Sequence, residues 1–167
     1  MTIESKSRRL LLSGAKATGL LAAALFAFAS AAGAGECPAD KVVASGQGLK
    51  PGATAPKDVT DVVLGMIDVA KEPAMIEGRQ FRLRRLEILP GGEVPWHSHE
   101  DRPALIYVVQ GQITEYSSDC SVPIQHLTGD VSVETAGVSH WWKNNSRTAT
   151  VLISADLLPV ESDPHVM

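Results

Sequence analysis

The amino-acid sequence predicts an all-β domain, built as a sandwich or barrel of antiparallel strands. Short runs rich in β-branched and aromatic residues recur between residues 58 and 158. Gly, Pro, Asn and Asp separate these runs, and such residues favour turns. Helix signals are nearly absent, because only residues 71–78 resemble a helical turn and Pro73 limits it. Regular strands without intervening helices are typical of closed antiparallel sheets.

The first 34 residues have the pattern of a signal peptide. A basic patch at residues 5–9 precedes an uncharged stretch from Ala17 to Gly35, and residues 32–34 offer an A-x-A cleavage site. Arg8 and Arg9, followed by leucines, look like a twin-arginine export signal, which predicts a periplasmic or secreted protein. The alternative is a retained membrane anchor, since the uncharged stretch nearly reaches the roughly 20 residues of a spanning helix.

The remaining chain divides into three parts. Residues 35–58 are rich in Gly and Pro and predict an irregular arm, residues 59–157 predict the barrel, and residues 158–167 predict a tail. Within this stretch, turns are expected at residues 90–92, 111, 117–121, 129–130, 136–137 and 144–145. The expected strands are 58–69, 79–89, 104–116, 122–127, 130–134, 140–144 and 148–158.

Charge and cysteine content restrict the partners and the compartment. The formal net charge is −4 for the full chain and falls to about −7 without the basic leader. Such a surface, with no basic run, argues against nucleic acid or an anionic membrane as a partner. Cys37 and Cys120 form an even pair, for which a disulfide is favoured over a metal site in an exported protein.

Three histidines are the candidate metal ligands. His97 and His99 are separated by one residue, so extended backbone places both imidazoles on the same face of a strand. His140, which follows a turn and begins a later strand, is the third candidate. His126 and His165 lack such partners in the sequence.

The spacing of these residues resembles that of a small single-domain cupin. Gly91, His97, His99 and Gly111 match G-x5-H-x-H-x3,4-E-x6-G. The second motif, G-x5-P-x-G-x2-H-x3-N, is matched by Gly129, Gly137, His140 and Asn144. The resemblance implies a jelly-roll barrel, a metal site, and pairing of two copies through exposed strands as a homodimer.

The chain departs from the first motif at the glutamate that completes the metal shell in this family. That position falls at Pro103 or Ala104, and Glu100 should point away from the face of His99. Asp101 would need a bulge to take the place of the glutamate. The prediction is therefore a site of three histidines for a divalent transition metal, whether Fe, Mn, Ni, Cu or Zn.

A three-histidine site retains the full divalent charge of its metal and should attract a small anionic or chelating molecule. Arg102, Trp142 and Asn144 are candidate contacts for this molecule. The three arginines at residues 82, 84 and 85 are interpreted as an exposed strand edge. No catalytic side chain and no organic cofactor site is assigned.

Three functions remain open. The first is an exported metal-dependent oxidoreductase similar in its ligand set to the thiol and diketone dioxygenases of the cupin family. The second is a periplasmic cupin that binds a small molecule or a metal without turnover, and the third is a structural or assembly role.

Overall fold

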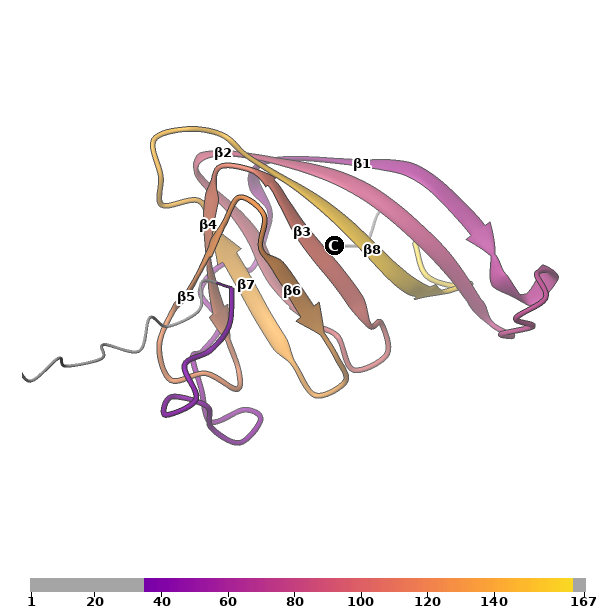
Figure 1. Cartoon of the computed structure of the whole chain (residues 1–167), viewed down its shortest axis with the longest axis horizontal. Helices are drawn as coiled ribbons and strands as arrows, with labels where there is room; N and C mark the ends of the chain where they lie inside the picture. Colours follow the sequence, from indigo (N-terminus) through magenta and orange to yellow (C-terminus); the bar gives the residue numbers. More distant parts are fainter. Residues whose placement is uncertain (1–34, 164–167) are drawn as a thin grey trace, which may run out of the picture. The chain divides into compact units, whose positions relative to one another are not determined.

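The structure, a computed structural model, describes residues 35–163, and in this part of the chain eight strands form one antiparallel sheet (Figure 1). The order in the sheet is β5-β4-β7-β2-β8-β3-β6, and β1 pairs with β2. The predicted signal peptide and residues 164–167 lie outside the described residues. The strands are β1 (Lys57–Asp68), β2 (Arg79–Ser98), β3 (Ala104–Gln110), β4 (Gln112–Ser117), β5 (Ile124–Leu127), β6 (Val131–Glu134), β7 (Ser139–Lys143) and β8 (Thr150–Pro159).

The sheet curls until its two halves share one core, which confirms the all-β barrel prediction. Ile113 of β4 and Trp142 of β7 come from one half, and they pack in the same buried cluster as Ile106 of β3 and Leu152 of β8. Side chains alternate along the strands, as in β3, where Ile106 is buried and its neighbour Leu105 is exposed. The other members of the core cluster are Leu86, Ile88, Val94 and Val108.

Strand β2 does not end at residues 90–92, where the sequence predicted a turn. It continues to Ser98, and it pairs with β8 through residues 79–88 and with β7 through residues 93–98. Gly91 has φ of +78°, a conformation that favours glycine. Gly92 is also required, because a Cβ there would lie 2.8 Å from the carbonyl oxygen of Leu89. These glycines therefore bend one strand between two parts of the barrel instead of ending it.

The helical turn predicted at residues 71–78 lies slightly earlier in the chain. A single 3-10 turn spans Val69–Lys71, and Asp68 caps it by accepting a hydrogen bond from the backbone N–H of Ala70 at 3.2 Å. The turn ends before Pro73, as the missing proline N–H requires. Among residues 35–163, no helix has the length and apolar character needed to cross a bilayer.

A disulfide joins Cys37 to Cys120 across 83 residues, which confirms the favoured reading of the two cysteines. Cys120 is fully buried in the loop between β4 and β5, and Val42 forms an isolated bridge with it. From residue 35 to residue 56, the arm contains no strand longer than this bridge, and its last two residues belong to β1. The disulfide therefore fastens the irregular arm to one end of the barrel.

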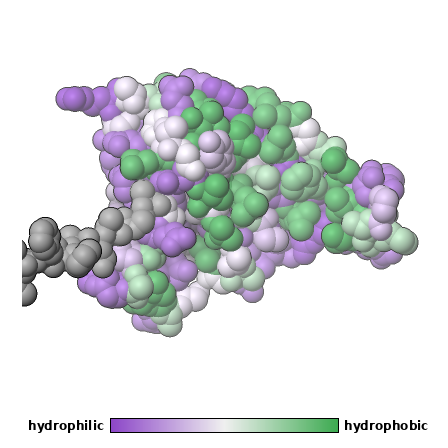
Figure 2. All heavy atoms as spheres, in the orientation of Figure 1, coloured by the Kyte–Doolittle hydropathy of each residue, from purple (hydrophilic) through white to green (hydrophobic). Residues whose placement is uncertain are grey.

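Apolar side chains also remain on the outer faces of several strands. Figure 2 shows apolar surface over the long strands on the face viewed in Figure 1. The exposed fraction reaches 64% at Val133 and 53% at Leu64. The exposed apolar residues of these strands include Val62, Leu64 and Met66 of β1, Leu105, Tyr107 and Val109 of β3, and Val131 and Val133 of β6.

Candidate metal centre

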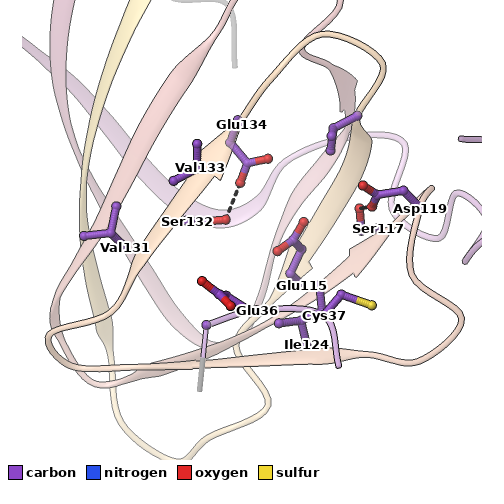
Figure 3. Close-up of a pocket in the computed structure, with 12 residues that line it drawn as sticks. Glu36, Cys37, Glu115, Ser117, Asp119, Ile124, Val131, Ser132, Val133 and Glu134 are labelled. Atoms are coloured by element: carbon purple, nitrogen blue, oxygen red, sulfur yellow. Dashed lines mark hydrogen bonds between the residues drawn. The ribbon is translucent and has the colours of Figure 1, made fainter. Parts of the chain in front are cut away.

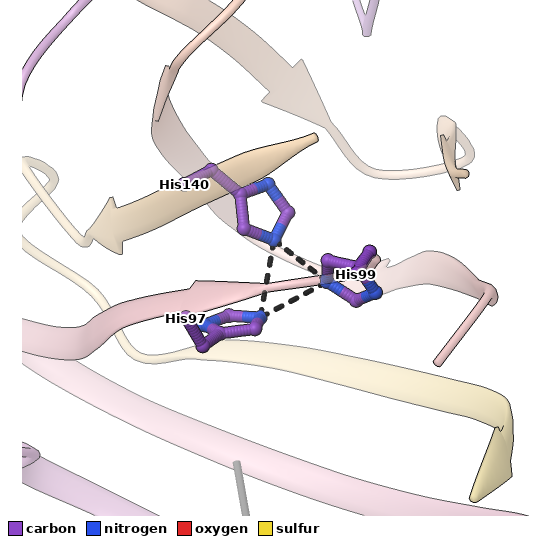
Figure 4. Close-up of side chains that lie close together, drawn as sticks. All are labelled: His97, His99 and His140. Carbon is purple, nitrogen blue, oxygen red and sulfur yellow. Dashed lines mark hydrogen bonds between the residues drawn. The ribbon is translucent and has the colours of Figure 1, made fainter. Parts of the chain in front are cut away.

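The three predicted histidines meet at one point inside the barrel (Figure 4). His97 lies near the end of β2 and faces His140 of β7, its partner in the strand register, while His99 follows directly after β2. The Nε2 atoms of His97 and His99 are 3.1 Å apart, those of His99 and His140 3.0 Å, and those of His140 and His97 3.1 Å. The three nitrogens thus form a nearly equilateral triangle.

The other nitrogen of each ring has an acceptor of its own. The Nδ1 of His97 lies 2.9 Å from the carbonyl oxygen of Pro95, and that of His99 lies 2.8 Å from the carbonyl oxygen of Arg102. The Nδ1 of His140 lies 2.7 Å from Oε1 of Glu115. Carbonyl and carboxylate oxygens accept only, so each Nδ1 carries the hydrogen and a neutral ring presents a bare Nε2.

Burial keeps two of the rings neutral. It lowers the pKa of His97 well below the ordinary value, and it lowers the pKa of His99 to about 4, with the charge of His140 adding to both effects. Burial also opposes a charge on His140, but Glu134 and Glu115 outweigh it and raise the pKa of that ring. The centre therefore attracts positive charge, which either a proton on His140 or a metal cation supplies.

The spacing of the nitrogens fits a metal ion. Two nitrogens each about 2.1 Å from one ion are about 3.0 Å apart when they subtend a right angle and about 3.4 Å apart at the tetrahedral angle. The observed separations of 3.0 to 3.1 Å match the right angle. The triangle therefore fits three ligands of one metal ion, and a shell of three protein ligands would leave other positions open.

Two cavities adjoin His97. The inner cavity has a volume of about 20 Å³, and its polar lining consists of Arg84, His97 and Ser154. An outer pocket of about 340 Å³ shares His97 and includes Asp101 and Arg102. The inner cavity has room for about one water-sized molecule. Its apolar lining consists of Leu86, Val94, Ile106, Trp142 and Leu152.

Asp101 does not replace the missing glutamate. Its carboxylate is mostly exposed and forms an ion pair with Arg79, so it points away from the histidines. Glu100 is exposed as well, as the alternation predicted. Among the described residues, the cluster that could hold an ion at His97 and His99 has His140 as its third member. This cluster contains no carboxylate.

Comparisons with known proteins identify the fold. Residues 84–156 match the cupin domain, a segment that holds all three histidines. The crystal structure of a predicted oxalate decarboxylase from Thermotoga maritima superposes with a TM-score of 0.50 over 70% of this chain and 97% of that one. The fold is a cupin jelly roll. Because the sequences are only 21% identical, this likeness shows the fold alone.

Curated proteins are also similar to part of this chain. Germin-like protein 1 of Brassica napus is 31% identical over 99 residues, which are 56% of this chain and 47% of the relative. Nectarin-1 of Nicotiana plumbaginifolia is 28% identical over 109 residues, 64% of this chain and 46% of the relative. The chain spans less than half the length of either relative.

Two residues near the histidine centre were not recognised in the sequence. Glu115 of β4 was not singled out, and His126 of β5, which lies outside the three-histidine group as expected, has a carboxylate partner that was not predicted. The carboxylate of Glu115 joins two rings, because its Oε1 accepts from His140 and its Oε2 lies 2.8 Å from Nε2 of His126. Burial raises the pKa of Glu115, but the hydrogen bonds from His126 and His140 outweigh it and lower that pKa to about 2.

A second buried carboxylate lies on the same side of His140. Oε2 of Glu134 is 3.4 Å from Nδ1 of His140, while its Oε1 accepts a hydrogen bond from Ser132 at 2.5 Å. Burial raises the pKa of Glu134. Both glutamates line a cavity of about 180 Å³ (Figure 3). In the sequence, Ser132 and Glu134 alternate with Val131 and Val133. This alternation was the signal that could have identified the buried glutamate.

The three residues predicted to contact a substrate occupy different environments. Trp142 is buried, lines the inner cavity, and directs its indole N–H to Nε2 of His140 at 3.3 Å. Arg102 lines the outer pocket, and its guanidinium lies 3.3 Å from the carboxylate of Asp156. Asn144 lies outside both cavities at His97, because its amide donates to Ile88 and Thr148 and accepts from the turn that follows β7.

Two of the three arginines that were predicted to form an exposed strand edge are buried, whereas Arg85 stays partly exposed and pairs with Glu87 at 3.0 Å. Arg82 and Arg84 are buried, because β2 lies between β1 and β8 and both side chains point inward. Both form ion pairs with Asp156, as does Arg102. Arg84 also pairs with Asp61 at 2.6 Å. A charged network therefore lies inside the barrel beside the histidine centre.

Proposed function

We propose that this protein is an exported cupin that binds a divalent transition metal through His97, His99 and His140. The observation that carries the proposal is the triangle of Nε2 atoms, 3.0 to 3.1 Å apart, with every Nδ1 held by an acceptor. Metal-binding histidines characteristically donate their second nitrogen in this way. Imidazole ligands suit iron, nickel, copper and zinc.

We propose further that the centre takes a small anionic or chelating molecule. A bound metal would act there as a Lewis acid, and an iron ion would also suit an oxidoreductase of the dioxygenase type. Next to His97 the chain supplies a mostly apolar inner cavity with room for about one water-sized molecule, and the outer pocket of about 340 Å³ would take a larger molecule. The positive charge of Arg102 acts on the same rings, since it contributes to the lowered pKa of both His97 and His99.

Export is supported by the disulfide between Cys37 and Cys120, since such bonds persist in oxidising compartments. The twin-arginine-like leader points the same way, because that resemblance implies export of a protein that has already folded around its metal. A periplasmic or secreted location is therefore part of the proposal.

Metal analysis of the protein purified from the periplasm, with no metal added afterwards, tests the metal centre. We expect close to one metal per chain, and His97→Ala should lose it. Lys143→Ala is the matched control, because Lys143 lies on β7 with His140 but pairs with Glu93. Less than roughly a tenth of a metal per chain in the unaltered protein contradicts the proposal.

Oxygen uptake separates an oxidoreductase from a binding protein. Iron-loaded protein is mixed with a panel of small diketones and thiols, and uptake that depends on His97 supports turnover. If no member of the panel causes uptake while the metal stays bound, the protein is a binder and the dioxygenase-type activity is rejected.

A further inference from the structure

We propose that Glu115 is a positioning residue that strengthens His140 as a ligand, so that the three histidines of the centre are not equivalent. The inference rests on the proposed metal site and concerns the side of His140 that faces away from the metal position. Glu115 touches neither His97 nor His99 through any hydrogen bond described above.

The acceptors behind the three rings differ in charge. His97 and His99 donate to neutral backbone carbonyls at 2.9 and 2.8 Å, whereas His140 donates to a carboxylate at 2.7 Å. A hydrogen bond to an ionised acceptor is roughly twice as strong as one between neutral groups. A carboxylate behind a metal-binding imidazole also raises the basicity of the ring. Among the three ligands, His140 is therefore the strongest electron donor.

The structure holds Glu115 firmly in this position. It lies on β4 opposite Trp142 of β7 and Ile124 of β5, and it is 3% exposed. Its second oxygen accepts from His126, and the ring of His126 stacks on Trp142 at 4.6 Å between centroids. Trp142 in turn points its N–H at His140, so four side chains form a closed circuit around the carboxylate. Few rotamers are compatible with all of these contacts.

Charge gives a second reason for the role of Glu115. A buried carboxylate is costly unless hydrogen bonds and an opposite charge compensate it. The two imidazole N–H groups provide the hydrogen bonds, and a divalent cation on the far nitrogen of His140 would provide the charge through one ring. Glu134 is a weaker candidate for this role, because it is 3.4 Å from the same Nδ1 and accepts from Ser132.

Chelator competition with Co²⁺ tests the proposal in the mature protein. Glu115→Gln keeps the shape and removes the charge, and loss of an outer-shell partner of this kind lowers metal affinity about 10 to 100-fold. The visible spectrum of bound Co²⁺ should shift as well, which a purely structural role would not cause. Lys143→Ala is the control, because Lys143 pairs with Glu93 and not with the histidines, and it should stay within roughly 3-fold of the unaltered protein.

Three outcomes decide the proposal. A folded Glu115→Gln protein with unchanged affinity and an unchanged Co²⁺ spectrum overturns it, as does an equal loss of affinity in Lys143→Ala. If the unaltered protein binds no Co²⁺, the proposed metal site is refuted. The proposed role of Glu115 is then refuted as well, because it depends on that site.

A second variant covers the case in which Glu115→Gln does not fold. His126→Phe keeps an aromatic ring on Trp142 and removes only the donor that holds the second oxygen of Glu115. We expect a smaller loss, about 2 to 10-fold, with the same direction of spectral shift. Unchanged affinity and spectrum in this variant would overturn the proposal in that case.

Discussion

Reduction of the disulfide between Cys37 and Cys120 should destabilise the protein strongly. The bond closes a loop of 83 residues, and the chain-entropy relation gives about 4 to 5 kcal/mol for a loop of this length. For a folded part of about 130 residues, this corresponds to a fall in melting temperature of roughly 15 °C. Urea unfolding of the oxidised and the reduced protein, followed by tryptophan fluorescence, measures the difference directly.

The control for this experiment is the double variant Cys37→Ala with Cys120→Ala. It should resemble the reduced protein and should not respond to the reductant. A difference below about 1 kcal/mol between oxidised and reduced protein would refute the reasoning. That result would mean that the arm hardly restricts the unfolded chain, or that the two thiols remain unpaired.

Three further predictions follow from individual contacts. Trp142→Phe should raise metal affinity about 2 to 5-fold in chelator competition, because the indole N–H competes for the lone pair of His140; a fall in affinity contradicts this. Asp156→Asn should lower the free energy of unfolding by about 3 to 5 kcal/mol, since it leaves buried guanidinium groups without their shared carboxylate. A loss below about 1 kcal/mol in urea would speak against that network. Replacing both Arg8 and Arg9 by lysine should empty the periplasmic fraction of a cell fractionation, and undiminished export would rule out the twin-arginine reading.

Much of the barrel could be predicted because the residue types that favour strands and turns are local information. The run from Ala104 to Gln110 is mostly apolar and rich in β-branched residues, which predicts a strand, although the sequence itself does not alternate between polar and apolar residues. The meeting of His97 and His99 follows from the period of two along a strand. Their approach to His140 depended on the spacing of both cupin motifs, since nothing local connects residues more than 40 positions apart.

The rest of the site depends on how the strands are aligned with one another. This register cannot be derived from the local sequence patterns. Glu115 reaches His126 only because β4 pairs with β5 and β7 in one particular alignment. Arg82 and Arg84 were predicted at the surface because charged side chains usually avoid the interior. Their burial is explained by Asp156, which lies on β8, directly opposite Arg82 in the pairing of β2 with β8. A partner of this kind is recognisable only after the strands are aligned.

The bend in β2 gives this chain an unequal tolerance for insertions and deletions. The segment from Gly92 to His97 already contains one shift in its pairing with β7, between Val94 and His97, so adding or removing one further residue there would exchange the inward and outward faces and turn His97 toward solvent. Adding two residues would restore the face but move the imidazole about 6.6 Å along the strand. The turn between β7 and β8 carries no such restriction on the histidines. Insertions and deletions in functional proteins related to this one should therefore occur in the turn between β7 and β8, and not in the few residues before His97.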